Sequence, residues 1–215
     1  MRHRITLAAA ITAMMIIAPA TASNASATLP FTAHPHGASY QTWLQRVGQF
    51  YLGDASNPLI AGLDGDCGEL IDGVFYLAAP IALDQEFDCT VRVGTPIVLS
   101  HAGWFATEGI DGDTDAELEA AAGTFPVVAS ELSVDGHEVR TQTFSTGAWD
   151  VMSEAGSFYD TIYGLGTGPI RTALSGNVVV LHPLAPGDHV IEAAVTFTDD
   201  LGDYSATYHI HVTTR

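Results

Sequence analysis

The sequence contains no lysine, and its 7 basic residues, all of them arginine, stand against 25 acidic ones, which gives a formal net charge of −18. A field of this sign repels the phosphates of nucleic acids and of anionic lipids. We therefore expect no nucleic-acid binding and no polybasic attachment to a membrane. The same charge favours a cationic partner, or solubility in high salt.

Catalytic signatures are also missing. The chain has no Gly-x-Ser-x-Gly elbow, no His-Glu-x-x-His helix, no Walker loop and no Gly-x-Gly-x-x-Gly after a strand. No cofactor is expected, with calcium or zinc as the alternatives. We interpret the protein as a binding module for an extracellular ligand or protein. The alternative is a secreted hydrolase or metal-dependent enzyme with its site in long loops at 101–130 and 145–175, since such loops are often functional.

One apolar run stands at the beginning of the chain. ITLAAAITAMMIIAPA follows the basic MRHR and precedes small residues, which is typical of a secretory signal peptide, here residues 1–27. No later segment approaches about 18 uninterrupted apolar residues, so no stable membrane span is expected. The product is expected to be extracellular, or periplasmic in a cell with two membranes, with a flexible leader at 28–37 and one domain at 38–215.

Cysteine is scarce, with only Cys67 and Cys89 in the whole chain. An exported protein meets an oxidising compartment, in which two such residues can pair. The alternative, a reactive thiol or half of a metal site, requires partners at close spacing that the sequence lacks. We therefore predict a Cys67–Cys89 disulfide.

The pattern of apolar residues predicts a mostly-β fold that begins with a helix. Tyr40, Trp43, Leu44 and Val47 follow helical spacing, with Ser39 as N-cap, and a glycine ends the segment at position 53. Beyond 58 the chain turns to short apolar or alternating runs. The predicted strands are 73–79, 89–93, 96–100, 131–134, 137–144, 177–182, 189–198 and 205–213, and the Asp-Gly at 135–136 predicts a hairpin turn.

Two resemblances extend this prediction. The tail LAPGDHVIEAAVTFTDDLGDYSATYHIHVTT resembles the last two strands of bacterial immunoglobulin-like domains from surface proteins. The segments TWLQRVGQFYL, NPLI, CGELIDGVFYLAAP, CTVRVGTPIVLS and LSVDGHEV look like those of a group of secreted bacterial and archaeal proteins, although Thr95 stands where that group has lysine. The resemblance implies an immunoglobulin-like β-sandwich and carries no activity with it.

The acidic stretch DGDTDAELE, residues 111–119, copies the first half of a calcium loop. A helix-loop-helix calcium site needs glycine at its sixth position and a carboxylate at its twelfth, where this chain has Ala116 and Ala122. Thr114 and Glu117 instead have the spacing of a capping box. The stretch therefore predicts one short additional helix, and a looser calcium site stays open as the alternative.

Two groups of residues are candidate metal ligands. His209 and His211 alternate with apolar residues, so they share one face of the last strand, where a third ligand such as His182 or Glu192 would complete a zinc or copper site. Asp199, Asp200 and Asp203 lie around a glycine in the loop before that strand, and their carboxylates suit calcium. The alternatives are a solvated strand face and a plain acidic turn.

His101 and Trp104 are the candidate catalytic residues. In SHAGWF they follow an apolar strand, where an indole ring could stack on a sugar and an imidazole could exchange protons. The sequence provides no further member of a catalytic group.

Overall fold

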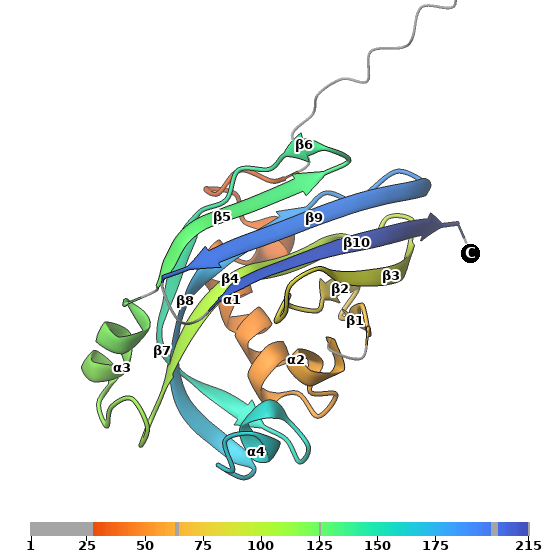
Figure 1. Ribbon diagram of the computed structural model, residues 1–215. Helices are drawn as coiled ribbons and strands as arrows, with labels where there is room; N and C mark the ends of the chain where they lie inside the picture. Colours follow the sequence, from red (N-terminus) through yellow and green to blue (C-terminus); the bar gives the residue numbers. More distant parts are fainter. Residues whose placement is uncertain (1–27, 63–64, 125, 199–201, 215) are drawn as a thin grey trace, which may run out of the picture.

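The computed structural model describes residues 28–62, 65–124, 126–198 and 202–214, so the predicted signal peptide at 1–27 lies outside the described residues. The described strands form two five-stranded sheets that face each other, as Figure 1 shows. This sandwich of sheets with an N-terminal helix confirms the predicted mostly-β fold class. The immunoglobulin-like topology stays a prediction.

Sheet A has the strand order β1-β2-β4-β8-β7, and sheet B the order β3-β10-β9-β5-β6. Two neighbouring pairs, β2 with β4 and β10 with β3, run parallel, and the other pairs run antiparallel. The strands of sheet A are β1 (Gly68–Ile71), β2 (Val74–Leu77), β4 (Ile97–Thr107), β7 (Thr143–Ser153) and β8 (Gly168–Leu181). Those of sheet B are β3 (Gln85–Arg92), β5 (Val127–Val134), β6 (His137–Glu138), β9 (Gly187–Phe197) and β10 (Asp203–Thr213).

The predicted N-terminal helix is present. It begins at α1 (Tyr40–Gly48), where the Ser39 side chain accepts a hydrogen bond from the Thr42 amide at 3.1 Å, and it continues as the π-helical turn η2 (Gln49–Gly53). The predicted short helix is α3 (Asp115–Ala122). Three shorter segments were not predicted: η1 (Pro35–Gly37), α2 (Pro58–Ala61) and α4 (Phe158–Thr161).

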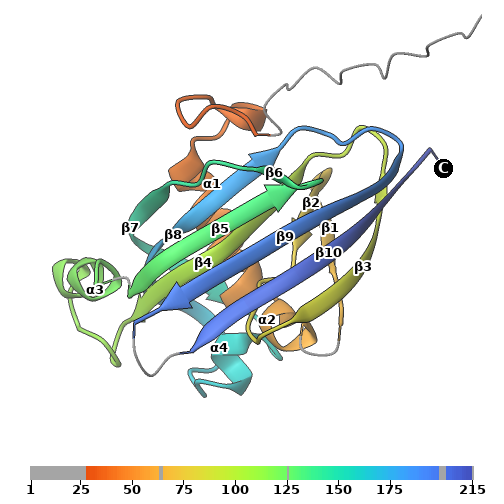
Figure 2. The ribbon, with the colours of Figure 1, turned by 45° about the horizontal axis from the view of Figure 1, so that its top comes forward.

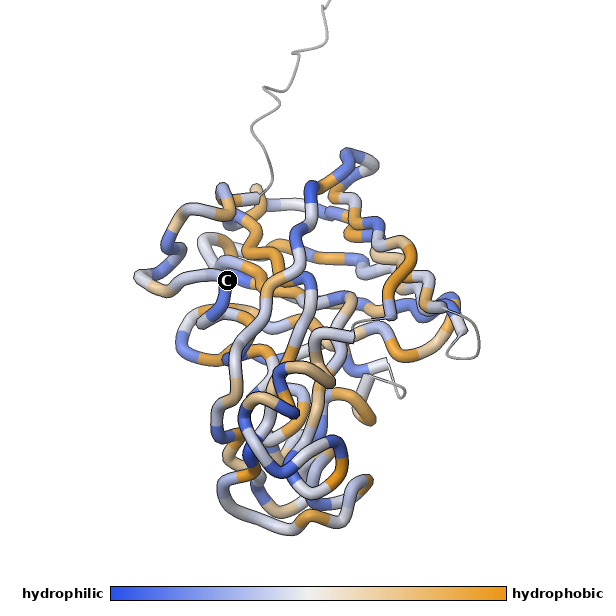
Figure 3. The backbone as a smooth tube through the Cα atoms, turned by 90° about the vertical axis from the view of Figure 1, so that its left-hand side faces the viewer, coloured by the Kyte–Doolittle hydropathy of each residue, from blue (hydrophilic) through white to orange (hydrophobic). Residues whose placement is uncertain are grey.

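Helix α1 covers the face of sheet A that points away from sheet B, so the molecule has three layers (Figure 2). Strand β8, which lies between β4 and β7, is buried on both faces over most of its length. Val178 and Val180 pack toward α1, while Val179 and Leu181 pack toward sheet B. Hydrophobic and hydrophilic segments alternate along much of the chain (Figure 3), as expected where one face of a sheet is buried and the other is open.

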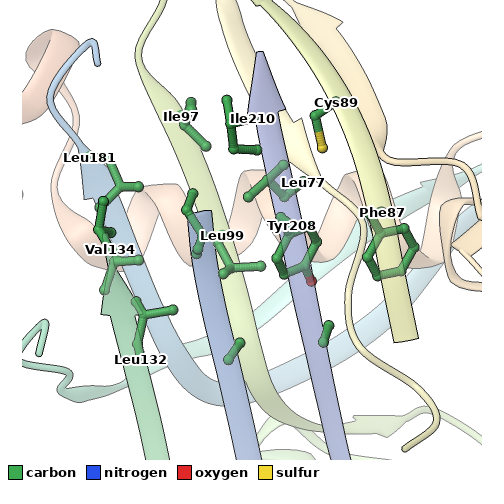
Figure 4. Close-up of a cluster of buried hydrophobic side chains, with 14 of the residues drawn as sticks. Leu77, Phe87, Cys89, Ile97, Leu99, Leu132, Val134, Leu181, Tyr208 and Ile210 are labelled. Carbon is green, nitrogen blue, oxygen red and sulfur yellow. The ribbon is translucent and has the colours of Figure 1, made fainter. Parts of the chain in front are cut away.

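The core between the sheets contains large side chains from both. Leu77, Ile97, Leu99 and Leu181 from sheet A meet Leu132, Val134, Phe87, Tyr208 and Ile210 from sheet B, as Figure 4 shows. The rings of Phe87 and Tyr208 stack with centroids 4.9 Å apart. The Tyr208 hydroxyl donates to the Ala78 carbonyl at 2.7 Å, so this buried polar group has a partner.

The predicted disulfide is confirmed. Cys67, just before β1, is bonded to Cys89 in β3, with their Cα atoms 5.5 Å apart. Because β1 is the edge strand of sheet A and β3 that of sheet B, the bond joins the two sheets at one side of the sandwich.

Side-chain amides cover the other edge of sheet A, at β7. Gln49 behaves like a piece of neighbouring strand: its Oε1 accepts from the Met152 amide and its Nε2 donates to the Met152 carbonyl, both at 2.8 Å. Gln41 donates to the Thr146 carbonyl at 2.9 Å. An open strand edge is a template for pairing with another chain, so these glutamines close it.

The segment expected as a flexible leader is in contact with the rest of the protein. Thr28 forms a bridge with Leu181, and the Leu29 carbonyl accepts a hydrogen bond from the Tyr40 hydroxyl at 2.7 Å. The Phe31 ring packs edge-on against Tyr40, with centroids 5.3 Å apart. Aromatic contacts of this kind attach the segment to α1.

The expectation of long loops at 101–130 and 145–175 is wrong for much of both ranges. Strand β4 runs through 101–107, so His101 and Trp104 lie within a strand, and β7 and β8 occupy most of the second range. The sequence pattern did not predict the full length of these strands, because bulges interrupt the alternation of buried and open residues along them. One bulge lies between Leu99 and Ala102 in β4 and another between Ser145 and Ala148 in β7.

Candidate functional site

His101 lies at the bulge of β4 and begins a chain of polar contacts between the sheets. Its side chain is 3% exposed, and its Nε2 lies 2.6 Å from the Oγ of Ser130 in β5. Asn177 of β8 donates from Nδ2 to the same Oγ at 2.8 Å. Thr143 in turn donates to the Asn177 Oδ1 at 2.8 Å. A partly buried hydrogen-bond chain, which begins at exposed Thr143 and ends at buried His101, thus links β7, β8 and β4 to β5.

The charge state of His101 follows from its burial. Burial lowers the pKa of His101 to about 4, so the ring is neutral near pH 7 and carries one N–H. The contact with Ser130 fits a proton on either ring nitrogen, because the serine oxygen can donate its own proton to Nε2 or accept from Nε2 beside Asn177. Nδ1 is buried and makes no hydrogen bond within the described part of the chain.

Ser130 and His101 have the separation of a nucleophile and its base, but the group is incomplete. In a catalytic triad a third residue holds the other ring nitrogen of the histidine, and none of the described residues does so for Nδ1 of His101. Trp104, the other candidate, is partly exposed and does not line the pocket that His101 lines. The structure therefore separates the two predicted residues and pairs His101 with Ser130, which the sequence did not suggest.

The candidate metal ligands His209 and His211 lie on the outer face of sheet B. His211 Nδ1 is 2.8 Å from Asp188 Oδ1 and its Nε2 is 3.9 Å from Asp88 Oδ1. Asp203 is exposed at the start of β10, and Asp199 and Asp200 lie outside the described residues. Within residues 28–62, 65–124, 126–198 and 202–214, no three His, Cys, Asp or Glu side chains form a group that could hold a metal ion.

Four of the five acids of the 111–119 stretch, Asp111, Asp115, Glu117 and Glu119, have structural partners for their carboxylates. Thr114 and Glu117 form the predicted capping box of α3. Asp111 accepts a hydrogen bond from the Thr107 amide at 2.8 Å. Asp115 pairs with Arg171 at 2.7 Å, and the hydrogen bond from Arg171 lowers the pKa of Asp115. The pair of Asp115 with Arg171 joins α3 to β8, and the bond of Asp111 with Thr107 fixes the loop before α3 to the end of β4.

A groove of about 1090 Å³ crosses the outer face of sheet B. It runs across the strands, and one line of cross-strand partners passes through all five. These residues, in order from β3 to β6, are Glu86, Thr207, Glu192, Ser133 and Glu138. Residues with small side chains, Ala194 and Ser205, lie beside this row and leave the space open.

Carboxylates and hydroxyls alternate along the row. Because neighbouring strands lie about 4.8 Å apart, the acids of alternate strands repeat at roughly 9.6 Å. The Ser133 hydroxyl donates to Glu192 Oε2 at 2.9 Å, which fixes the middle carboxylate. Arg140 is the only base among the described residues that line the groove. The acids that line it are Asp84, Glu86, Glu131, Glu138 and Glu192.

Sequence reasoning missed the groove because its members are distant in the chain. Glu86 and Glu192 come together only when β10 pairs with β3 on one side and with β9 on the other. The available signal was the alternation of each strand, which places every second residue on the open face. The order of the strands was needed to align those faces.

No family model and no curated protein matches this chain. One solved structure, described as "Structure of PbICP-C in complex with falcipain-2", matches at 12% sequence identity with a TM-score of 0.27. The match covers 61% of this chain and 91% of that chain. A likeness at this level carries no argument about the site, which rests on its own geometry.

The described residues contain no helix that is long and apolar enough to cross a membrane.

Proposed function

We propose that the protein is an exported binding module that holds an extended, basic segment of an extracellular partner in the groove of sheet B. The observation that carries the proposal is the row from Glu86 to Glu138, in which a carboxylate returns on every second strand. The formal net charge of −18 adds a long-range attraction for cations. The predicted signal peptide and the disulfide support export.

The spacing of the row favours one backbone conformation of the partner. A polyproline II helix repeats every third residue with a rise of about 3.1 Å per residue, which places basic side chains at roughly 9.3 Å. That distance matches the repeat of about 9.6 Å between carboxylates on alternate strands. A segment with arginine at every third position would therefore present one guanidinium to each carboxylate.

The test uses two synthetic peptides of identical composition. One is an Arg-Pro-Pro repeat of about twelve residues, and the other has its arginines in one block. Isothermal titration calorimetry at low ionic strength should show the repeat binding about tenfold tighter, and added salt should weaken both. Equal affinity for the two peptides would show that the row of carboxylates does not distinguish peptides by the spacing of their arginines.

Matched variants locate the binding surface. Glu192→Gln removes the middle charge of the row and should lower the affinity for the Arg-Pro-Pro peptide by up to about fivefold. Glu69→Gln removes an exposed carboxylate from β1 of the other sheet and should leave the affinity unchanged. If both variants lower the affinity for the peptide equally, the peptide is attracted by the net charge alone and the groove is not its binding site.

A second candidate function, hydrolysis by a serine nucleophile, is favoured by the 2.6 Å contact between Ser130 and His101. A reactive serine would be labelled covalently by a fluorophosphonate probe, and Ser130→Ala would abolish the labelling. Intact protein without label after prolonged incubation would remove this candidate and leave the binding module.

A further inference from the structure

The outer edge of β3 is a free strand edge of sheet B. β3 pairs with β10 on one side and stands at the end of the strand order, so none of the described strands covers its other side (Figure 2). Its eight residues run beside β10 without a bulge, and exposed and buried side chains alternate from Glu86 to Arg92. An uninterrupted edge of this kind is a template for pairing with another strand.

The hydrogen bonds at the end of β3 show which backbone groups point outward. The Val93 amide donates to the Thr213 carbonyl of β10 at 2.8 Å. Because the backbone groups of successive residues point to opposite edges of a strand, the N–H and C=O groups of Glu86, Asp88 and Thr90 point away from β10. None of these six groups forms a hydrogen bond with another described residue.

The exposed side chains along this edge carry opposite charges at its two ends. Glu86 and Asp88 are acids near the beginning of β3, and Arg92 is a base at its end. The ion pairs formed by the described residues involve neither Glu86 nor Arg92. A second copy of the same edge, placed antiparallel, reverses this order and brings the basic end of one strand to the acidic end of the other.

We propose that two copies of the protein form a dimer in which β3 pairs antiparallel with β3 of the second copy around a two-fold axis. The axis passes beside Cys89, so Asp88 lies opposite Thr90 of the partner subunit and Glu86 lies opposite the partner's Arg92. The two central pairs exchange backbone hydrogen bonds, and the two outer pairs are cross-strand ion pairs. A shift that places Asp88 opposite the partner's Asp88 sets like charges together and is unfavourable.

The contact closes on itself and is weak. A two-fold interface uses the same edge of both copies, so assembly through it stops at two. The formal net charge of −18 on each copy opposes association, and one pair of strands makes a small interface. We therefore expect a dissociation constant on the order of tens of micromolar. The dimer does not depend on what the groove of sheet B binds.

Sedimentation equilibrium of the intact, oxidised protein at about 0.15 M salt tests the dimer. The average mass should rise from one copy toward two as the concentration passes the expected dissociation constant. Amide hydrogen exchange at Asp88 and Thr90 should slow over the same range, because their N–H groups become bonded across the axis. A protein that stays monomeric at about 1 mM would overturn the proposal.

A backbone variant locates the contact at β3. Thr90→Pro removes the outward N–H at the centre of the edge, and edge strands tolerate proline, so the fold should survive. The affinity between copies should fall at least about tenfold, whereas Thr90→Val keeps the N–H and should change it less than about threefold. Thermal unfolding of each variant verifies that it is folded. A dimer that persists in Thr90→Pro would mean that the copies meet at another surface and would contradict the proposal.

Exchange of the two charges tests the register without altering the backbone. Arg92→Glu and Glu86→Arg each set like charges opposite each other, so each should lower the affinity at least about tenfold. The double variant Glu86→Arg, Arg92→Glu should return to within about threefold of the wild-type affinity. Arg46→Glu makes the same change in net charge as Arg92→Glu, on exposed α1, and should leave the affinity unchanged.

Two outcomes of the charge exchange would overturn the pairing. One is a folded double variant that stays as weak as the single variants, and the other is an equal loss of affinity in Arg46→Glu. Glu192→Gln, the variant that tests the groove, should leave the dimer unchanged, because Glu192 lies on β9 and not at the β3 edge. Failure of the dimer and failure of peptide binding are therefore observed separately.

Discussion

Burial of one imidazole makes the stability of the protein depend on pH. The folded chain holds the pKa of His101 at about 4, because burial disfavours the charged ring, whereas an unfolded histidine titrates near 6.5. Between these values the unfolded chain binds the proton and the folded chain does not, so the free energy of unfolding falls as the pH falls. The contribution is fully present above about pH 6.5 and lost by about pH 4.

We therefore predict that His101→Phe loses less stability on acidification than the wild-type protein. A shift of this size is worth about 3 kcal/mol, so the difference in unfolding free energy between pH 7 and pH 4 should shrink by roughly that amount. Urea unfolding at the two pH values measures it. Trp104→Phe, which keeps His101, should follow the wild-type curve, and parallel curves for all three proteins would contradict the prediction.

Gly68 is a position where no other residue fits. Its φ is 144°, and a Cβ would run into the carbonyl oxygen of Tyr76 in the neighbouring strand. Gly68→Ala should cost at least about 2 kcal/mol of unfolding free energy. Gly73→Ala is the matched control, because it also has a positive φ, of 80°, but open space around it, so it should cost only about 1 kcal/mol. Equal losses by denaturant unfolding would show that the close contact with Tyr76 is unimportant.

Among the elements, α3 depends on its first turn. The Thr114 side chain accepts from the Glu117 amide at 3.3 Å, and the Glu117 carboxylate accepts from the Thr114 amide at 3.0 Å. Thr114→Ala should destabilise the protein by about 1 kcal/mol, and Thr114→Ser should restore most of the loss. Amide hydrogen exchange within Asp115–Ala122 reports the effect directly, and unchanged exchange in the alanine variant would argue against the cap.

The glutamine clamp on β7 can be tested by self-association. Gln49→Ala frees both backbone groups of Met152 at the edge of sheet A, and a free edge can pair with a second copy. Sedimentation velocity over a range of concentrations should show dimers or larger species in the variant and fewer in the wild-type protein. Gln49→Glu keeps one acceptor and should give an intermediate result. A strictly monomeric alanine variant would show that other contacts protect this edge.

Local signals predicted the elements that depend on local contacts. The cap at Ser39, the capping box at Thr114 and the Asp-Gly turn at 135–136 each lie within a few residues of their partners, so the sequence alone locates them. Most of β7 and the part of β8 before residue 177 were not predicted, because buried polar residues such as Thr146 and Thr172 are explained only by partners far along the chain. The pairing of His101 with Ser130 was not predicted for the same reason, because the two residues lie far apart in the sequence.

At the scale of the whole molecule, the disulfide joins the sheets. Cys67 and Cys89 are separated by 22 positions, and closing a loop of that length stabilises by about 3 kcal/mol in the chain-entropy description. The double variant Cys67→Ala, Cys89→Ala should lose about this amount in denaturant unfolding at pH 7, as should the reduced wild-type protein. If reduction leaves the unfolding midpoint unchanged, the packing between the sheets alone holds their edges together.

The place of β10 in sheet B has a consequence for the order in which the protein is made. β10 is the last of the described strands, yet it lies between β3 and β9 and is the strand that pairs with β3 (Figure 1). Until residues 203–213 have left the ribosome, β3 has no strand to join in sheet B, although its own residues were made more than a hundred positions earlier. We therefore expect sheet B to close over the core only after β10 has been synthesised.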